Sequence, residues 1–227
     1  MTALRYSEPR PAVVPTSDAA IDGDLSTVFA TATAAPRSPF AAGDALFRQG
    51  DPVRLVYRIL RGAVISYRLL SDGRRQVTGF HLPGDYLGLE AGVEHATTAE
   101  ALGAVDALAM ERSERAASAV TDIGLARALW QVSVRAFQRS EDHALILARQ
   151  GATERVAAFL LDFAQRNGGV LTIDLPMTRQ DIADHVGLTI HTVSRTLSQL
   201  QAQGMIEARS SRQVRLLDRQ RLEWLCA

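Results

Sequence analysis

The chain has 227 residues, of which 47% are hydrophobic, and its 25 basic and 25 acidic residues cancel to a formal net charge of zero. This length suits one large core or two modest ones, and the neutral balance means that any binding to nucleic acid must come from a local basic face. The single cysteine, Cys226, excludes an internal disulfide, a cysteine-rich zinc site and a four-thiolate iron–sulfur cluster within one chain. The sequence contains neither a long apolar run nor a cationic leader before an apolar block, so we expect a cytoplasmic protein without a membrane partner.

The first half of the chain predicts an arm followed by a β-domain. Residues 1–25 are rich in Pro, Ala, Ser and Asp without apolar periodicity, which predicts a mobile N-terminal arm. Over residues 26–120, short apolar segments such as LVYRIL and AVISYRLL alternate with Gly-Asp turns such as PGDYLG. Short strands at near-regular spacing are typical of an antiparallel barrel or jelly roll. The alanine-rich stretch 99–114 keeps the same turn rhythm, and we predict two further strands there.

A long helix is predicted over residues 121–150. Its apolar side chains recur at heptad-like spacing, at Leu125, Leu129, Val132 and Ala136. Such a stripe packs either against the chain's own barrel or against the same helix of a second subunit, and we expect it to hold a homodimer. Gly151 interrupts the helical pattern before a further amphipathic helix, so it is a candidate hinge to a second domain, residues 151–227.

Residues 178–201 divide at Gly187 into two short helices with shared apolar positions. Thr178 and Thr189 can each cap one helix, and Gly187 can take the positive φ of a tight turn. This order is typical of a helix-turn-helix, in which the N-terminal half of the second helix enters the major groove of DNA. Two β-prone pieces around Ser210 predict a hairpin wing, and residues 176–227 carry seven arginines against five acidic residues, a net charge of +2 that suits phosphate contacts.

The motif indicates which side chains touch DNA. Arg195 is the best candidate for a bidentate contact to guanine O6 and N7, worth about 1–3 kcal/mol of discrimination. The candidates for reading bases are Ile190, His191, Ser194 and Arg195. The candidates for contacting the DNA backbone are Thr178, Arg179, Thr189, Thr192, Arg209 and Arg212. Each arginine alone could be a solvated surface charge, but the ordered set of helix, turn, helix and basic wing favours DNA binding.

Two stretches, FHLPGDYLGLEAG and LPMTRQDIADHVGLTIHTVSRTLSQL, together resemble the CRP/FNR superfamily of bacterial transcription regulators and are most similar to its FixK branch. The resemblance spans about residue 38 to the C-terminus. It implies an α+β fold with an N-terminal antiparallel β-roll like that of cyclic-nucleotide-binding domains, a long dimerisation helix and a C-terminal winged helix-turn-helix. It also implies a homodimer on a palindromic site in double-stranded DNA, usually an activator that touches RNA polymerase, in oxygen-limitation, nitrogen-fixation or respiratory gene control.

The chain departs from the family at two places that bear on ligands and bases. Members that bind cyclic nucleotides carry a Gly-Glu pair and an Arg-Ser or Arg-Thr pair where this chain has Gly88-Leu89 and Thr97-Thr98. Without that arginine for the cyclic phosphate we expect no cAMP binding. FNR and FixK members usually have Glu in place of His191, and Glu accepts a hydrogen bond from cytosine N4. Neutral imidazole donates from one nitrogen only, so His191 either shifts the base preference or contacts phosphate or water.

No sensor or cofactor is predicted. The arm has none of the cysteines that hold the FNR cluster, and a haem with His81 or His95 as axial ligand is the less favoured alternative. A ligand-responsive regulator of the same fold, or a ligand-binding module whose winged helix contacts protein, needs a ligand set in the barrel. The charged candidates there form no recognisable arrangement: Arg74, Arg75, Glu90, Glu94 and Glu100.

An enzyme is the least favoured class. Asp181 and Asp184 lie near His185 in the sequence, which could suggest acid–base or metal chemistry. Carboxylates at i and i+3 near a helix N-terminus are far more often a solvated face, where negative charge is stabilised. We therefore expect neither a catalytic nor a metal site, and we interpret Cys226 as an incidental thiol.

Overall fold

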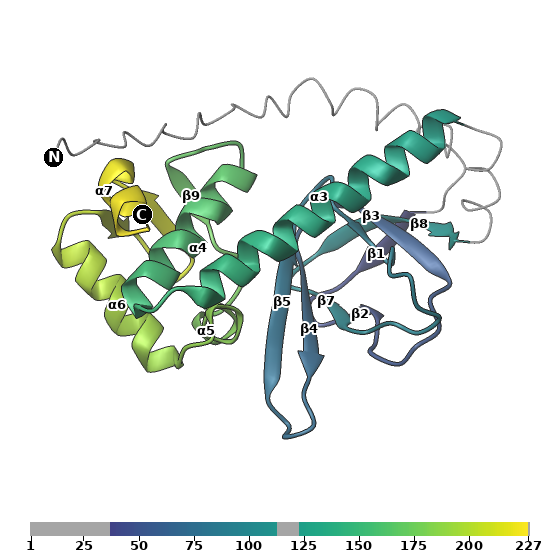
Figure 1. Cartoon of the computed structure of the whole chain (residues 1–227), viewed down its shortest axis with the longest axis horizontal. Helices are drawn as coiled ribbons and strands as arrows, with labels where there is room; N and C mark the ends of the chain where they lie inside the picture. The colour runs from purple at the N-terminus through teal and green to yellow at the C-terminus, as the bar shows by residue number, and fades with distance from the viewer. Residues whose placement is uncertain (1–36, 113–122, 227) are drawn as a thin grey trace, which may run out of the picture. The chain divides into compact units, whose positions relative to one another are not determined.

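The computed structural model describes residues 37–112 and 123–226, so the predicted arm of residues 1–25 lies outside the described part. The first described segment forms two four-stranded antiparallel sheets (Figure 1). Its strands are β1 (Arg37–Phe40), β2 (Ala45–Phe47), β3 (Leu55–Arg61), β4 (Val64–Leu69), β5 (Arg75–His81), β6 (Tyr86–Leu87), β7 (Thr98–Ala101) and β8 (Val105–Glu111). The orders are β1-β8-β3-β6 and β2-β7-β4-β5. The predicted antiparallel β-roll is confirmed, including the two strands within 99–114.

Alternating burial explains why these segments are strands. Val105 and Ala107 of β8 point into the interior while Asp106 between them is less buried, as period-two alternation requires. Gly88, after β6, has φ +82°, and a Cβ there would collide with the carbonyl oxygen of Leu55. The chain can pass β3 this closely only because residue 88 has no side chain.

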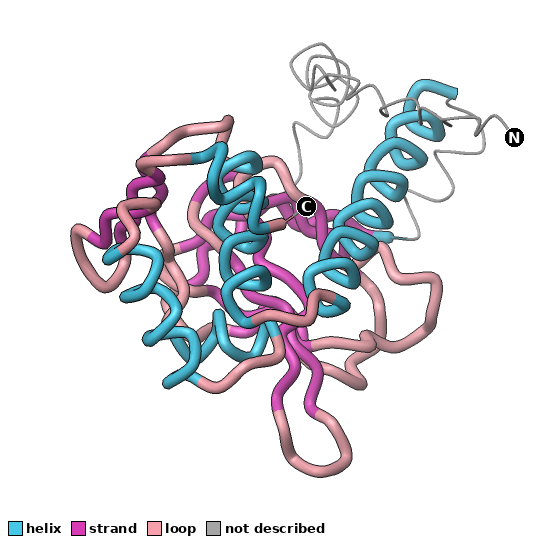
Figure 2. Tube along the Cα trace, turned by 60° about the vertical axis from the view of Figure 1, so that its left-hand side comes forward, coloured by secondary structure: helices cyan, strands magenta, loops and turns pink. Residues whose placement is uncertain are grey.

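Two helices meet at the predicted break. Helix α3 (Ile123–Ala148) is a single long helix (Figure 2). It has 26 residues, and α4 (Ala152–Arg166) begins immediately after Gly151, which is its N-cap with an extended backbone. Glycine weakens helix interiors by about 1 kcal/mol relative to alanine, so the break falls where helical continuation is least favoured. Among the described helices, none is both long and apolar enough to cross a membrane.

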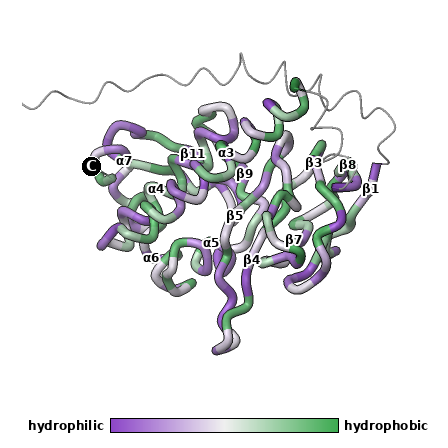
Figure 3. Tube along the Cα trace, turned by 45° about the vertical axis from the view of Figure 1, so that its right-hand side comes forward, coloured by the Kyte–Doolittle hydropathy of each residue, from purple (hydrophilic) through white to green (hydrophobic). Residues whose placement is uncertain are grey.

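The C-terminal segment is a winged helix-turn-helix. Its further elements are β9 (Thr172–Asp174), α5 (Arg179–Val186), α6 (Ile190–Ala202), β10 (Ile206–Ala208), β11 (Gln213–Leu216) and α7 (Arg219–Leu225). The predicted hairpin wing is β10–β11, which gains β9 as a third strand through the pairing of Val214 with Ile173. The sequence did not indicate β9 or α7. Apolar and polar residues alternate along the helices (Figure 3), and the apolar faces of α4, α5 and α6 share one core.

That core also includes residues from the β-roll. Ile65 of β4, with Val77 and Phe80 of β5, belong to the same buried cluster as Ile146 of α3 and the apolar face of α4. The ring centroids of Phe80 and Phe159 lie 6.0 Å apart in an edge-to-face arrangement, which is a favourable geometry for aromatic pairs. Strand β5 therefore packs directly against the helical segment that carries the helix-turn-helix.

Candidate nucleic-acid interface

Local sequence signals define both helices of the helix-turn-helix. The Thr178 hydroxyl accepts a hydrogen bond from the Asp181 N–H (3.1 Å), and the Asp181 carboxylate accepts one from the Thr178 N–H (2.8 Å), a complete capping box. Thr189 caps α6 by accepting from the Thr192 N–H at 3.2 Å. Gly187 takes φ +66° and its N–H bonds to the Ala183 carbonyl, which ends α5 and turns the chain into α6.

Helix α6 presents one open polar face. Val193, Leu197 and Leu200 point into the core. The opposite side, at i, i+1, i+4 and i+5, is exposed and carries the four predicted base-reading residues: Ile190, His191, Ser194 and Arg195. In the described part of the chain, the side chains of His191 and Arg195 make no intrachain hydrogen bond or ion pair. Both side chains are therefore available to an external partner.

The predicted backbone-contact residues differ in their availability. The hydroxyls of Thr178, Thr189 and Thr192 already take part in helix caps. Arg179 is half-buried: its Nη1 has no hydrogen-bond partner, and burial lowers its pKa. Arg209 pairs with Glu207 at 3.0 Å, while Arg212 is exposed on the wing and its guanidinium has no partner among the described residues. Among the described residues of the wing, Arg212 and Arg215 are thus exposed cations without an ion-pair partner.

Helix α3 has two apolar faces, and the predicted dimer stripe lies on the less exposed one. Leu125 and Val132 are only 3% exposed within the single chain, and Leu129 and Ala136 are half-buried, so that face packs inside the protomer. Three of the exposed large apolar residues instead follow a seven-residue repeat, Ile123 (86% exposed), Trp130 (70%) and Phe137 (63%), while Leu145 (62%) lies one position off it. We call the face that carries Ile123, Trp130 and Phe137 the outer stripe. The other a and d positions of the repeat hold small, exposed residues: Ala126, Ser133, Ser140 and Ala144.

Two acidic residues of α5 are tied to the β-roll. Arg75 of β5 donates through Nη2 to Asp181 (2.5 Å) and through Nε to Asp184 (3.0 Å). Burial alone would raise the pKa of Asp181, but its hydrogen bonds with Thr178 and Arg75 hold that pKa below its ordinary value. Asp181 and Asp184 are therefore ion-pair partners of Arg75, and this structural role does not support the acid–base chemistry that their positions in the sequence could suggest.

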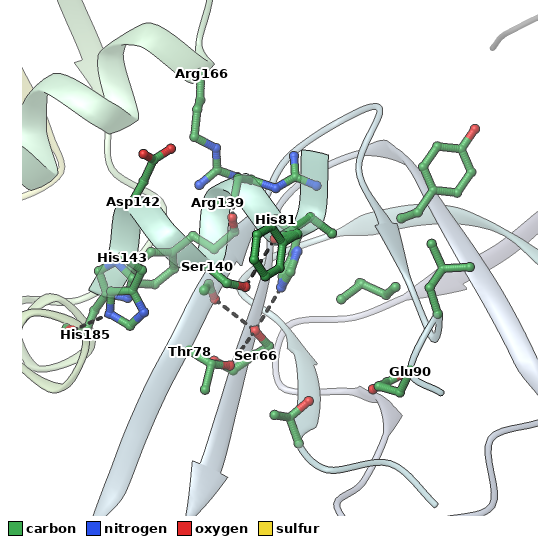
Figure 4. Close-up of a pocket in the computed structure, with 18 of the residues that line it drawn as sticks. Ser66, Thr78, His81, Glu90, Arg139, Ser140, Asp142, His143, Arg166 and His185 are labelled. Atoms are coloured by element: carbon green, nitrogen blue, oxygen red, sulfur yellow. Dashed lines mark hydrogen bonds between the residues drawn. The ribbon is translucent and has the colours of Figure 1, made fainter. Parts of the chain in front are cut away.

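His185 is structural as well. Its Nδ1 donates to the Val77 carbonyl of β5 at 3.3 Å, and its ring stacks on His143 of α3 with centroids 3.9 Å apart (Figure 4). His143 in turn donates from Nε2 to the His185 carbonyl at 2.8 Å. Burial, and then the nearby His143, lower the pKa of His185 to about 3. The ring is thus held neutral where α3, α5 and β5 meet.

A cavity of about 570 Å³ lies between the β-roll and α3. Two arginines line it, and both pair with Asp85 of the Gly84-Asp85 turn: Arg139 at 2.6 Å and Arg166 at 3.1 Å. Burial would raise the pKa of Asp85, but the two arginines outweigh it and hold the pKa below its usual range. Both guanidinium groups thus already have a carboxylate partner inside the chain, and Arg166 pairs with Asp162 as well.

The two histidines considered as haem ligands already have partners. His81 lines the cavity and its Nε2 is hydrogen-bonded to Ser66 at 2.8 Å (Figure 4). Burial lowers its pKa to about 4. His95 is buried, stacks on Phe47 with ring centroids 3.7 Å apart, and donates from Nδ1 to Glu90 at 3.2 Å. These hydrogen bonds occupy one ring nitrogen of each histidine, and Nδ1 of His81 is buried without a hydrogen-bond partner.

Comparisons with known proteins agree with this arrangement. Residues 37–117 match the cyclic nucleotide-binding domain family, and residues 154–225 match the Crp-like helix-turn-helix domain family. The nitrogen fixation regulation protein FixK of Azorhizobium caulinodans is 44% identical over 82% of this chain and 77% of its own length. The FixK of Rhizobium meliloti is 40% identical over 82% of this chain and 85% of its own.

A solved structure extends the similarity to three dimensions. FixK2 from Bradyrhizobium japonicum superposes with a TM-score of 0.79 at 42% sequence identity, covering 85% of this chain and 97% of the other. The β-roll, the long helix and the winged helix-turn-helix thus recur together and in the same order. On these grounds the chain belongs to the CRP/FNR family of DNA-binding transcription regulators, within its FixK branch.

Proposed function

We propose that this protein binds an inverted repeat in double-stranded DNA as a homodimer and activates transcription by contacting RNA polymerase. The observation that carries the proposal is the open face of α6, where Arg195 and His191 are exposed and unpaired within the described chain. The names of the similar FixK proteins support a place in nitrogen-fixation gene control. In this assignment the β-roll and α3 hold the dimer, and residues 151–227 bind DNA.

The side chains of α6 have distinct roles in this proposal. Arg195 donates two hydrogen bonds to guanine O6 and N7, and Ser194 beside it bonds a neighbouring base edge. Ile190 suits the methyl group of thymine. His191, in neutral form, donates one hydrogen bond, so it favours an acceptor such as guanine N7 or thymine O4 over the amino group of cytosine. Thr178, Arg179, Thr189, Thr192, Arg209 and Arg212 contact the phosphates on either side.

Dimerisation through α3 supplies the second half-site. The outer stripe of Ile123, Trp130 and Phe137 is exposed over two heptads, which is too large and too regular an apolar surface for an isolated helix in water. Pairing two copies about a two-fold axis covers this stripe and places two α6 helices on the same side. Two half-sites about one helical turn apart, roughly 34 Å, then bind the same dimer.

DNA binding in this proposal requires neither cAMP nor haem. Leu89 and Thr97, which line the cavity, offer no cation for a cyclic phosphate, while Arg139 and Arg166 both pair with Asp85 and Arg166 pairs with Asp162 as well. The second candidate function, an effector-responsive regulator of the same fold, rests on the cavity itself, whose volume of about 570 Å³ suits a small molecule.

Selection of bound duplexes from a randomised DNA pool tests the proposal, with purified protein at stated salt and no added ligand. We expect an inverted repeat to be enriched, and Arg195→Ala, folded and dimeric, to enrich none. Run-off transcription with RNA polymerase on a promoter carrying the selected site then measures activation. No enrichment by the folded native protein would contradict ligand-independent binding, and enrichment that appears only with a bacterial metabolite extract would favour the effector-responsive candidate.

A further inference from the structure

Arg75 connects two segments more than one hundred residues apart in the chain. Its guanidinium forms ion pairs with both Asp181 and Asp184 of α5, at 2.5 and 2.9 Å from Nη2. All three side chains are largely shielded from water, with exposed fractions of 29%, 8% and 15%. The guanidinium also lies over the ring of Tyr67, 5.3 Å from its centroid. We call this set of Arg75, Asp181, Asp184 and Tyr67 the clasp.

The geometry of the clasp requires an arginine. Nε and Nη2 of one planar group serve two carboxylates while its face rests on an aromatic ring. A lysine ammonium could approach one carboxylate but could neither stack nor hold both in fixed directions. The neighbouring Gln76 adds a hydrogen bond from its amide to the Asp184 carbonyl at 2.8 Å, so β5 holds the side chains and the backbone of α5 together.

The clasp acts on the element that orients the DNA-reading helix. Asp181 is the N3 residue of the capping box of α5, and α5 turns into α6 through the tight bend at Gly187. Helices α5 and α6 share buried residues, including Ile182, Val186 and Val193, so they move as one body. The ion pairs of Asp181 and Asp184 with β5 therefore fix the direction of α6 relative to the β-roll and to α3. The proposed two-fold axis of the dimer runs along the outer stripe of α3.

We propose that Arg75 is a positioning residue that sets the spacing between half-sites to which the dimer binds. This inference rests on the proposed function as a dimeric DNA-binding protein. With both clasps closed, the two α6 helices are held at one separation and one relative orientation. Without them, the arrangement of the two α6 helices that fits the DNA is one of several. The apparent affinity is then the intrinsic affinity multiplied by the fraction of dimers in that arrangement. The dimer then loses affinity on the best spacer but tolerates wrong spacers better.

The test measures affinity against a series of duplexes. Each carries the selected inverted repeat with its central spacer unchanged, or shortened or lengthened by one or two base pairs, and fluorescence anisotropy gives a Kd for each. For Arg75→Gln we expect about a tenfold weaker Kd on the best spacer, and a spacer penalty, the ratio of Kd on altered and best spacers, at least about threefold smaller than for the native protein. A merely structural weakening would lower all affinities in proportion.

Two matched variants sharpen the comparison. Arg74→Gln removes the same charge from the adjacent position, where the guanidinium pairs with Asp72 in the exposed turn, and should behave as the native protein. Asp184→Ala removes one of the two carboxylates that Arg75 pairs with while leaving the capping box of α5 intact, and should show part of the effect of Arg75→Gln, in the same direction. The double variant should be no worse than Arg75→Gln alone, because Arg75→Gln already removes the contact with Asp184.

Several results would overturn the inference. A folded, dimeric Arg75→Gln protein with an unchanged spacer penalty refutes it, whether or not its affinity falls. If Arg75→Gln does not fold, the same result for Asp184→Ala has the same meaning. If the native protein binds no specific sequence, the proposed function fails and this inference fails with it. If the native protein shows a sharp spacer optimum that Arg75→Gln preserves, only the inference fails.

Discussion

Truncation of Trp130 to alanine is the sharpest perturbation of the proposed dimer. Trp130 is 70% exposed in the single chain and occupies the middle of the outer stripe. A tryptophan side chain carries roughly 200 Å² of surface, so about 150 Å² is available for burial by a second copy. At about 25 cal/mol per Å² this gives an upper value of roughly 3–4 kcal/mol per protomer. With about half of it realised, two symmetric truncations cost about 4 kcal/mol, or roughly a thousandfold in the dimer Kd.

Sedimentation equilibrium over a range of protein concentrations measures this Kd. Gln138→Ala provides the control, since it changes an exposed side chain next to Phe137 but outside the outer stripe. Substitution of Val132, which is 3% exposed, should lower the free energy of unfolding more than it weakens the dimer. A Trp130→Ala protein with a dimer Kd within about threefold of the native value would refute the assignment of the dimer to this face.

Three further predictions concern stability and readout. Burial lowers the pKa of His185 to about 3 and of His81 to about 4. Near pH 6.5 these two histidines therefore bind protons in the unfolded chain but stay neutral in the folded chain. The stability present above pH 6.5 should fall as the pH drops toward 4, by roughly 3 kcal/mol at pH 5.5 in urea unfolding, and a pH-independent curve between 7.5 and 5.5 would contradict this. Thr178→Ala should lower the free energy of unfolding by about 1 kcal/mol, because α5 loses its cap, whereas Thr178→Ser should not. Arg195→Lys should lose about 1–3 kcal/mol of preference for guanine at one position, and His191→Glu should shift the base selected at another toward cytosine, both measured by repeating the selection; an unchanged base profile would remove the residue from readout.

Local signals made the helix-turn-helix predictable from the sequence. The capping residues Thr178 and Thr189, and the glycine at 187, act on backbone groups within three or four residues, so their effect does not depend on the rest of the fold. The β-roll was predictable for a similar reason, since its Gly-Asp turns mark where each strand ends. Strand β9, with three residues, exists because Ile173 pairs with Val214, some forty residues later, and no local pattern indicates that pairing.

Periodicity in the sequence could not show which apolar face of α3 is exposed in the folded chain. A helix packed on one side and paired on the other carries two apolar stripes, and their spacing is the same. The residues Leu125 and Val132 satisfy the heptad rule as well as Trp130 and Phe137 do, and only burial in the folded chain separates them. The ion pairs of Arg75 with Asp181 and Asp184 could not be predicted from the sequence either, because the packing of β5 on α5 brings these distant residues together.

In the proposed function, one dimer reads two half-sites without an effector. The most direct measurement of this binding is the stoichiometry and Kd of the ligand-free native protein on the selected duplex, and on the same duplex with one half-site scrambled, by sedimentation and fluorescence anisotropy. We predict two protomers per duplex and at least about a hundredfold weaker Kd when one half-site is lost, since the second contact is then no longer intramolecular. One protomer per duplex, or equal affinity for both duplexes, would contradict the binding of one ligand-free dimer to two half-sites.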